Sequence, residues 1–277
     1  VVGSVTPEAM TQLSVREMRR VVVRRWLFRF SVLTGWIAFV AAWYGLSSLV
    51  LNTQQLPPPH IVAREAWNVI TESGFAGHIR ATLTRVLGGF LLASVASAGL
   101  GWLIAHSAWW RTLLRTIVQL IVSTPIVGLA VVTLFVFGVS SRGPTLVAAV
   151  VATSYMAMNV AQGLAGVEKN LVVMSESFGR TRSQITWGVL LPSSFISLLT
   201  GARLAFAAAW RVELLTEVFA ASDGVGFKIR RSFESYDVRG MLAWTVIFVA
   251  LMLIFENLVF RRIDNRLQAR TGQRPQS

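Results

Sequence analysis

The sequence contains no cysteine and carries little charge. Without cysteine, disulfides, thiol chemistry and cysteine-ligated zinc sites are excluded. Charged residues make up only 14% of the chain and hydrophobic residues 54%, whereas a soluble domain carries about 25% charged residues. Residues 1–25 are polar and basic and include no early apolar stretch, so we expect no cleavable signal peptide. This composition indicates an integral membrane protein.

The motifs of common enzyme classes are missing as well. No G-x-x-x-x-G-K-[S/T] phosphate loop occurs, so ATP hydrolysis is not expected on this chain. The three histidines, His60, His78 and His106, are scattered and lack the spacing of a metal site. A net charge of +13 is typical of nucleic-acid binding. Here the basic residues lie between apolar runs that are too long for a soluble core, so we expect no nucleic-acid partner.

Six apolar segments are close to the roughly 20 residues that a membrane-spanning helix needs. They are Phe28–Val50, Thr84–His106, Leu113–Phe137, Pro144–Gly163, Pro192–Ala221 and Met241–Phe260. The third contains Pro125, which lacks a backbone donor and should kink the helix. We therefore predict an all-α membrane protein with six transmembrane helices.

The distribution of basic residues predicts the orientation. With the N-terminus inside, the inner segments carry roughly twice as many Lys and Arg as the outer loops, which favours this arrangement. Arg111 and Arg115 then lie on the inner side, and Arg80 and Arg85 on the outer side. The predicted order is a cytoplasmic basic segment (1–27), a first transmembrane helix (28–50), a periplasmic loop with a short helix (51–83), a five-helix core (84–262) and a cytoplasmic tail (263–277).

The segment Gly179–Pro192, G-R-T-R-S-Q-I-T-W-G-V-L-L-P, is polar and basic although it lies between two long apolar runs. The predicted orientation places it in the cytoplasm. A hydrophobic protein has little reason to build a polar helix there unless a soluble partner docks on it. The alternative interpretation is an ordinary basic inner loop that serves only topology.

The spacing of this segment resembles the cytoplasmic loop signature of ABC importer permeases. That signature is Glu-Ala-Ala, three residues, Gly, nine residues, then Ile-x-Leu-Pro. Gly179 and Val189–Pro192 match it, whereas Val173, Met174 and Ser175 stand at the Glu-Ala-Ala positions, with Glu176 directly after them.

Further motifs resemble the nitrate/sulfonate/taurine/bicarbonate branch of these permeases. They are Leu56–Pro59 before a short helix, Thr82–Phe90, Phe137-Gly138, Leu199–Arg203 and Ala220–Gly226. The resemblance implies the type I importer transmembrane fold, with a five-helix permease core after an extra first helix.

The resemblance also implies a set of partners and a location. Two permease chains, here as a homodimer, would form the pathway in the lipid bilayer of the bacterial inner membrane, with both termini cytoplasmic. Two ATPase subunits would bind ATP and Mg²⁺ and dock at the cytoplasmic loops. A periplasmic binding protein would deliver the solute. This chain itself would hold no cofactor or metal and catalyse no reaction.

The resemblance assigns residues 170–183 as the coupling helix that contacts the ATPase. Phe178 offers an apolar side chain to a groove, and Arg180 and Arg182 offer charge to its rim. The complete set of expected coupling residues is Val173, Ser175, Glu176, Phe178, Gly179, Arg180, Arg182, Leu191 and Pro192.

The predicted fifth span carries charged residues, which are costly at membrane depth unless they are paired or face water. Glu213 and Glu217 are four residues apart and share a helix face, which Arg203 is also expected to share. Arg211 is then free to contact an anionic substrate, and the alternative is a structural ion pair across the permease interface. Secondary candidates for the pathway, for which helix packing is the alternative, are Trp210, Tyr155, Asn159, Gln162, Ser123 and Thr124.

The function predicted from these observations is that of the permease subunit of an ABC importer for a small anionic solute. The alternative is a stand-alone secondary transporter or channel. A secondary transporter would need carboxylates for a coupling ion and usually internal repeats, and the sequence shows no inverted repeat.

Overall fold

The structure is a computed structural model that describes residues 30–31, 33–50, 52 and 54–271. Every regular element within these ranges is a helix, which confirms the predicted all-α class. The chain divides into two compact units, Val1–Arg64 (unit 1) and Glu65–Ser277 (unit 2), which are described separately. The predicted basic segment 1–27 and the last part of the predicted tail, 272–277, lie outside the described residues.

Unit 1 contains an apolar helix, Leu33–Leu49, whose last turn runs into the π-helical turn η1 (Leu46–Val50). Trp43 Nε1 donates a hydrogen bond to the carbonyl of Pro57 at 3.1 Å, so the chain after the helix folds back along it. The described helix is shorter than the predicted first span, Phe28–Val50, because residues 28, 29 and 32 of that span lie outside the described part of the chain.

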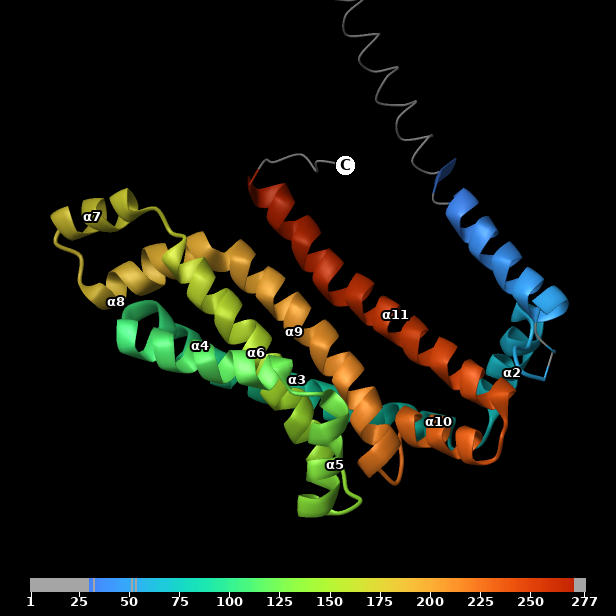
Figure 1. The fold of residues 1–277 in the computed structure, drawn as a ribbon. Coiled ribbons are helices and arrows are strands. Elements are labelled where there is room, and N and C mark those ends of the chain that lie inside the picture. The colour runs from blue at the N-terminus through green and yellow to red at the C-terminus, as the bar shows by residue number, and fades with distance from the viewer. Residues whose placement is uncertain (1–29, 32, 51, 53, 272–277) are drawn as a thin grey trace, which may run out of the picture. The chain divides into compact units, whose positions relative to one another are not determined.

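Unit 2 contains the helices that are long and apolar enough to cross a membrane (Figure 1). In the described part of the chain there are four such helices, or five if one strongly bent pair is a single span. The elements that follow α2 (Pro59–Thr71) are α3 (Phe75–His106), α4 (Ala108–Ser123), α5 (Ile126–Phe137), α6 (Arg142–Ala165), α7 (Lys169–Ser177), α8 (Arg182–Ile185), the π-helical turn η2 (Thr186–Leu190), α9 (Leu191–Ala220), α10 (Val225–Glu234) and α11 (Val238–Thr271). Each of the five predicted core spans corresponds to one of the long helices or to the bent pair.

Two helices begin earlier than the hydropathy indicated. α3 begins at Phe75 and not at Thr84, so Arg80 lies within this helix and its position in the loop predicted over residues 51–83 was wrong. α4 begins at Ala108 and not at Leu113, so Arg111 also lies within a helix. The reason is that a charge ends an apolar run but does not end a helix, because backbone hydrogen bonding continues through it.

The kink predicted at Pro125 is a complete break between α4 and α5, which are bent by 92°. Thr124 has φ −74° and ψ 130°, an extended conformation. A proline ring disfavours the helical conformation of the residue before it, so α4 ends at Ser123. The third predicted span is therefore two short apolar helices at nearly a right angle.

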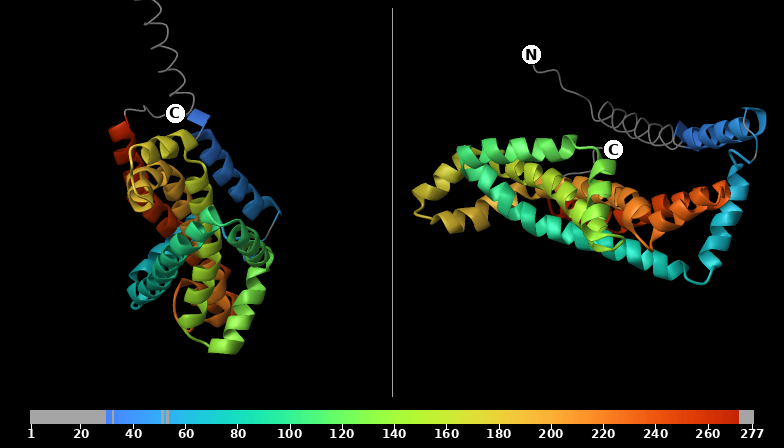
Figure 2. Two further views of the ribbon diagram at one scale, coloured as in Figure 1. Left: turned by 90° about the vertical axis from the view of Figure 1, so that its left-hand side faces the viewer. Right: turned by 60° about the horizontal axis from the view of Figure 1, so that its bottom comes forward.

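Helices α3, α6 and α9 form the centre of unit 2 and lie side by side in Figures 1 and 2. Alanines from all three helices are buried together where they meet, and they are Ala93, Ala148, Ala152, Ala205 and Ala209. A side chain at Gly89 would place its Cβ 3.0 Å from the carbonyl oxygen of Thr145, so this glycine lets α3 and α6 approach closely. Small residues are the usual means of close helix packing in membranes.

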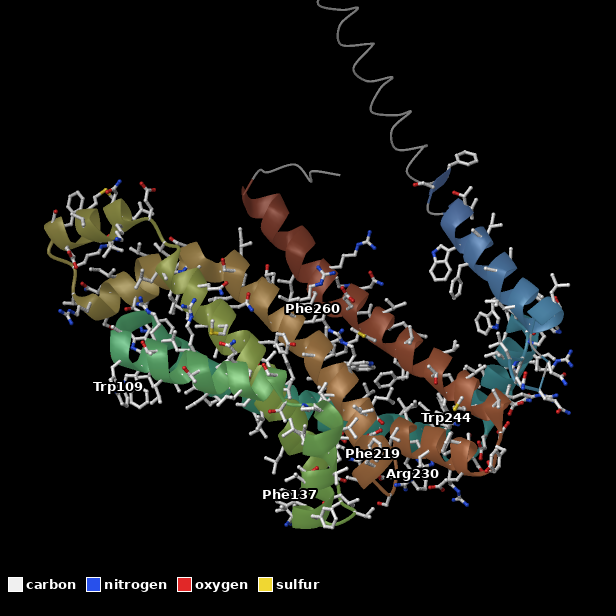
Figure 3. The ribbon with its side chains drawn as sticks, in the orientation of Figure 1. Trp109, Phe137, Phe219, Arg230, Trp244 and Phe260 are labelled. Atoms are coloured by element: carbon white, nitrogen blue, oxygen red, sulfur yellow. The ribbon has the colours of Figure 1, made fainter. Side chains whose placement is uncertain are left out.

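Unit 2 has two distinct ends. Figures 1 and 2 show α7 and α8 projecting at one end and α10 at the other. At the α10 end, α10 packs against α9 and α11. The aromatic side chains of Phe206, Trp210, Trp244 and Phe248 are buried in the core there, and Figure 3 shows Trp244 at the start of α11 close to α10.

Candidate functional site

The segment with the permease signature forms two short helices joined by a tight turn. Gly179 has φ +72°, a left-handed conformation that glycine adopts without a steric penalty. Its amide donates to the carbonyl of Glu176 at 2.9 Å, and the amide of Arg180 donates to the carbonyl of Ser175 at 3.2 Å. These two bonds are the Schellman pattern that ends a helix. The predicted coupling helix 170–183 is thus divided at Gly179 into α7 and α8.

The second helix begins with a complete capping box. Thr181 Oγ1 accepts a bond from the amide of Gln184, and Gln184 Oε1 accepts one from the amide of Thr181 at 2.9 Å. Both side chains therefore satisfy backbone donors at the helix start, which stabilises it by about 1 kcal/mol. The turn fixes the direction of the chain between α7 and α8.

Pro192, which closes the signature, lies at the start of α9 directly after η2. A proline within a helix removes one backbone hydrogen bond and its ring collides with the carbonyl four residues earlier. That carbonyl belongs to Gly188, which lies inside the wider π-helical turn. Residues Arg182–Ala220 consequently form one continuous apolar helix of 39 residues.

Several large apolar side chains of this region are exposed. Phe178 is 79% exposed and Trp187 72% exposed, and Val173 and Met174 are more than half exposed. The other expected coupling residues divide into two groups. Ser175 is buried and donates from Oγ to the carbonyl of Leu171, and Leu191 is half-buried. The remaining side chains, which are exposed, are those of Glu176, Arg180, Arg182 and Pro192.

At the α10 end, two buried charged side chains pair. Arg85 of α3 and Glu217 of α9 are both buried, and Arg85 Nη1 lies 2.7 Å from Glu217 Oε1. Thr82 Oγ1 lies 2.9 Å from each carboxylate oxygen, and the amide of Gly226 donates to Oε2 at 2.9 Å. The Glu217 carboxylate thus has donors from three residues, two on α3 and one on α10, which compensates the cost of burying its charge.

Arg85 also binds the loops around this pair. Nη1 donates to the carbonyl of Asp223 at 2.9 Å and Nη2 donates to Ser141 Oγ at 2.8 Å, and Nη2 forms an ion pair with the Asp223 side chain. His78 Nδ1 accepts a bond from the amide of Gly224. One guanidinium therefore joins α3 and α9 to the start of α6 and to the turn between α9 and α10.

Arg230 of α10 covers the end of α9. Its Nη1 donates to the carbonyl of Val218 at 3.3 Å and its Nη2 to the carbonyl of Ala221 at 3.2 Å. Figure 3 shows Arg230 beside Phe219 at this end of α9. Cations near the last carbonyls of a helix are favourable because they satisfy orphan acceptors. The last carbonyls of α9 are therefore capped by a side chain of α10.

The charged candidates of the fifth span have different surroundings. Glu213 is fully buried, and neither of its carboxylate oxygens has a hydrogen-bond partner in the described part of the chain. Glu217 is bound by Arg85. Arg203 is half exposed and forms an ion pair with Glu256 of α11. Arg211 is exposed, and its Nε donates to the carbonyl of Ala207 one turn earlier.

The secondary pathway candidates are also divided. Trp210 is fully buried in the aromatic core. Tyr155 is 39% exposed, Gln162 is exposed, and Asn159 is half-buried with its amide bonded to the carbonyl of Tyr155. Ser123 and Thr124 stand at the α4–α5 break. Of these six candidates, only Tyr155, Gln162 and Ser123 are exposed in the structure.

The Arg85–Glu217 pair was not found from the sequence, because Arg85 was used only as an outer-side charge in predicting the orientation and was not considered as a partner of Glu217. A signal was nevertheless present. Glu217 is a carboxylate in a predicted span, and such a group needs a partner. On α3, Arg85 stands one helical turn after Thr82. Together these two side chains supply donors to the Glu217 carboxylate.

Comparisons with known proteins agree with this architecture. Residues 97–273 match the family described as binding-protein-dependent transport system inner membrane component. The taurine transport system permease protein TauC of Escherichia coli is 25% identical over 242 residues, covering 84% of this chain and 87% of TauC. The riboflavin transport system permease protein RibX of Chloroflexus aurantiacus is 29% identical over 196 residues, covering 71% of each chain. Other relatives are named for aliphatic sulfonates and nitrate.

A solved structure shares the fold. It is an inward-facing form of the MetNI methionine ABC transporter, with a TM-score of 0.58 and 20% identity, and the match covers 79% of this chain and 99% of that one. This likeness confirms the predicted type I importer fold of the transmembrane domain.

Proposed function

The chain belongs to the family of binding-protein-dependent transport system inner membrane components, and from this premise we propose that its α7–α8 end is the docking site of a separate ATPase subunit. The protein is a multi-pass permease subunit of an ABC importer and not an enzyme. In the proposed complex ATP and Mg²⁺ bind the partner subunits, because this chain has no phosphate-binding loop.

The exposure of Phe178 is the observation that carries the docking proposal. This side chain is 79% exposed at the end of α7, beside the left-handed turn at Gly179. Val173 and Met174 of α7 are exposed as well, and a group of exposed apolar side chains among polar residues marks a site of protein contact. A short helix that inserts such a group into a groove is a common mode of recognition, and Arg180 and Arg182 would lie at the rim of that groove.

The connection from α8 to α9 supports a mechanical role. α8, η2 and α9 form one helix from Arg182 to Ala220, so a displacement of α8 is passed along α9 as a rigid body. The far end of α9 carries Glu217, which joins α3 and the α9–α10 turn through Arg85. Closure of the ATPase subunits would thereby change the packing at the α10 end.

The proposed assembly has two copies of this chain, two ATPase subunits and a periplasmic binding protein. Exposed side chains along α9 would lie against the second copy or the pathway, and they are Ile196, Thr200, Leu204 and Arg211. In the proposed orientation both termini and the α7–α8 end are cytoplasmic, as the distribution of basic residues favours. The binding protein then meets the α10 end.

The proposed solute is small and anionic. Relatives are named for taurine, aliphatic sulfonates and nitrate, each of which carries an oxyanion. Arg211 is an exposed cation within α9, and a cation in a span faces a pathway or a partner by default. The alternative for Arg211, a structural ion pair, would require a carboxylate from the second copy, because the described part of this chain gives it none.

A substitution of Phe178 tests the docking. The permease is purified with its ATPase and binding protein, and Phe178→Ala is compared with Phe233→Ala. Phe233 is 70% exposed on α10, at the other end of unit 2. We expect Phe178→Ala to lose co-elution with the ATPase and binding-protein-stimulated ATP hydrolysis, while Phe233→Ala retains co-elution.

Two results would contradict the proposal. Normal co-elution of Phe178→Ala together with normal stimulated hydrolysis would exclude this end as the docking site. Solute flux by the purified chain alone, with no ATPase bound, would favour the alternative function of a stand-alone secondary transporter or channel.

A further inference from the structure

We propose that a cavity between α4 and α6 binds the anionic group of the transported solute, with Arg115 as the cation. The cavity has a volume of about 360 Å³ and is lined by Arg115, Val118, Gln119, Val122, Ser123 and Met158. This inference rests on the proposed import function and names a site within it. Only Ser123 of these residues was a candidate from the sequence.

The polar residues of the cavity lie on one face of α4. Arg115, Gln119 and Ser123 are spaced four residues apart, so their side chains follow one another along the helix surface. A guanidinium, an amide and a hydroxyl thereby line the same wall. Val118, Val122 and Met158 supply the apolar part of the lining, as in most small-molecule sites.

Arg115 differs from the paired arginines of unit 2 in lacking an acidic partner. Arg85 is paired with Glu217 and Asp223, and Arg203 with Glu256. Neither α4 nor α6 contains an aspartate or a glutamate, and no ion pair of Arg115 occurs in the described part of the chain. Its counter-charge must therefore come from outside these two helices.

The position of Arg115 makes an unpaired charge costly. It lies seven residues after Ala108, the first residue of α4, which is about 10 Å along the helix axis. Helix α4 belongs to the bent pair that is apolar enough to form a span. Arg115 is exposed in the isolated chain. A cation within a span faces a water-filled path or an anion, and the cavity provides room for both.

The size and chemistry of the cavity select the ligand. A volume of about 360 Å³ lies at the lower end of the range for ligand sites, which suits a small solute. The planar guanidinium donates two parallel hydrogen bonds to an oxyanion such as a sulfonate, a carboxylate or nitrate. A neighbouring cavity of about 440 Å³ contains no charged residue and lacks this selectivity.

The absence of cysteine makes a direct test simple. In the complete transporter in membranes, Ser123→Cys is the only thiol of the permease. Its labelling rate is measured with a negatively charged thiosulfonate reagent and with a positively charged one of similar size. We expect Arg115→Ala to lower the anionic-to-cationic rate ratio about threefold, because it removes a full charge from the same helix face about two turns away.

A control cysteine and a control arginine make the result specific. Ser183→Cys lies on α8, far from the cavity along the chain, and its rate ratio should not change with Arg115→Ala. Arg142→Ala removes an exposed charge at the start of α6 and should leave the Ser123→Cys ratio unchanged. An unchanged ratio with Arg115→Ala would overturn the proposal.

Transport provides the second readout. With a panel of small sulfonates, carboxylates and nitrate, Arg115→Ala should raise the KM for the transported anion at least several-fold, while Arg115→Lys keeps part of the affinity. Co-elution with the ATPase should persist, so a failure here is distinct from a failure of docking at Phe178. Anion attraction without any change in transport would overturn the assignment to the solute.

Discussion

The two ends of unit 2 contrast in where their side chains find partners. At the α10 end, the buried Glu217 carboxylate has donors from Arg85, Thr82 and the amide of Gly226. At the α7–α8 end, the backbone is capped from within, but Phe178 and Trp187 expose most of their apolar surface. The buried ion pair at the first end finds its partners within the chain, although Glu213 nearby has none in the described part of the chain and Phe233 is exposed. The second end has no such buried pair, and it leaves the apolar surface of Phe178 and Trp187 for another molecule to cover.

This contrast predicts that substitutions at the two ends change different properties, the stability of the permease at one end and the formation of its complex at the other. Substitutions at the α10 end should reduce the stability of the permease itself, because they leave a buried group without its partner. Substitutions of exposed side chains at the α7–α8 end should leave the isolated permease unchanged and alter only its complex. Measurements on the permease alone and on the complex therefore distinguish the two ends.

The largest loss of stability is expected for Arg85→Ala. It leaves the fully buried Glu217 carboxylate without its cation, and breaking a buried ion pair from one side costs about 3–5 kcal/mol. The melting temperature of the purified permease in detergent should fall strongly. Arg142→Ala, which removes an exposed arginine at the same end, should leave it unchanged, and equal effects of the two variants would contradict the role of the pair.

A smaller loss is expected for Gly226→Ala. The added Cβ would lie 2.6 Å from the carbonyl oxygen of Leu214 and 2.9 Å from the amide nitrogen of Val218. Both are backbone atoms and cannot rotate away, so the strain should cost about 1–3 kcal/mol. Gly77→Ala is the matched control, since nothing lies within 4 Å of its added Cβ. A melting temperature equal to that of the control would disprove the close contact.

Much of the helical architecture could be predicted from the sequence because long apolar runs mark membrane helices. All five predicted core spans correspond to helices or to the bent pair, and the break at Pro125 follows from proline chemistry. The helix starts could not be predicted. Charged residues such as Arg80 and Arg111 continue a helix without being apolar, so their helices extend beyond the hydropathy limits.

Local backbone features of the candidate site could be predicted from the sequence, whereas the Arg85–Glu217 pair, which depends on distant contacts, was missed. Gly179 and Pro192 act through the backbone of their own turns, so their spacing was informative. The partner of Glu217 stands 132 positions earlier in the chain, and no local pattern reports such a contact. For the same reason, the burial of Trp210, a pathway candidate, in the aromatic core could not be predicted from the sequence.

At the other end, Gly179→Ala should have a local effect. Gly179 has φ +72° with open space around it, so the cost is conformational, about 1–2 kcal/mol for a residue with a Cβ. Hydrogen exchange of residues 169–180 should become faster, with little change in the melting temperature. Gly179→Asn should be milder, because asparagine tolerates this conformation. Unchanged exchange in Gly179→Ala would show that the turn does not require glycine.

The smallest effect on the permease itself is expected for Trp187→Ala. This side chain is 72% exposed and buries little surface in the isolated chain, so its removal should leave the melting temperature as it is. In the complex, an aromatic side chain of this size at a contact can contribute 2 kcal/mol or more, on the order of a contact hot spot. Co-elution with the ATPase should therefore weaken while the permease remains folded. If Trp187→Ala instead lowered the melting temperature and left co-elution intact, this side chain would stabilise the permease itself and not its complex. The contrast between the two ends would then not include η2.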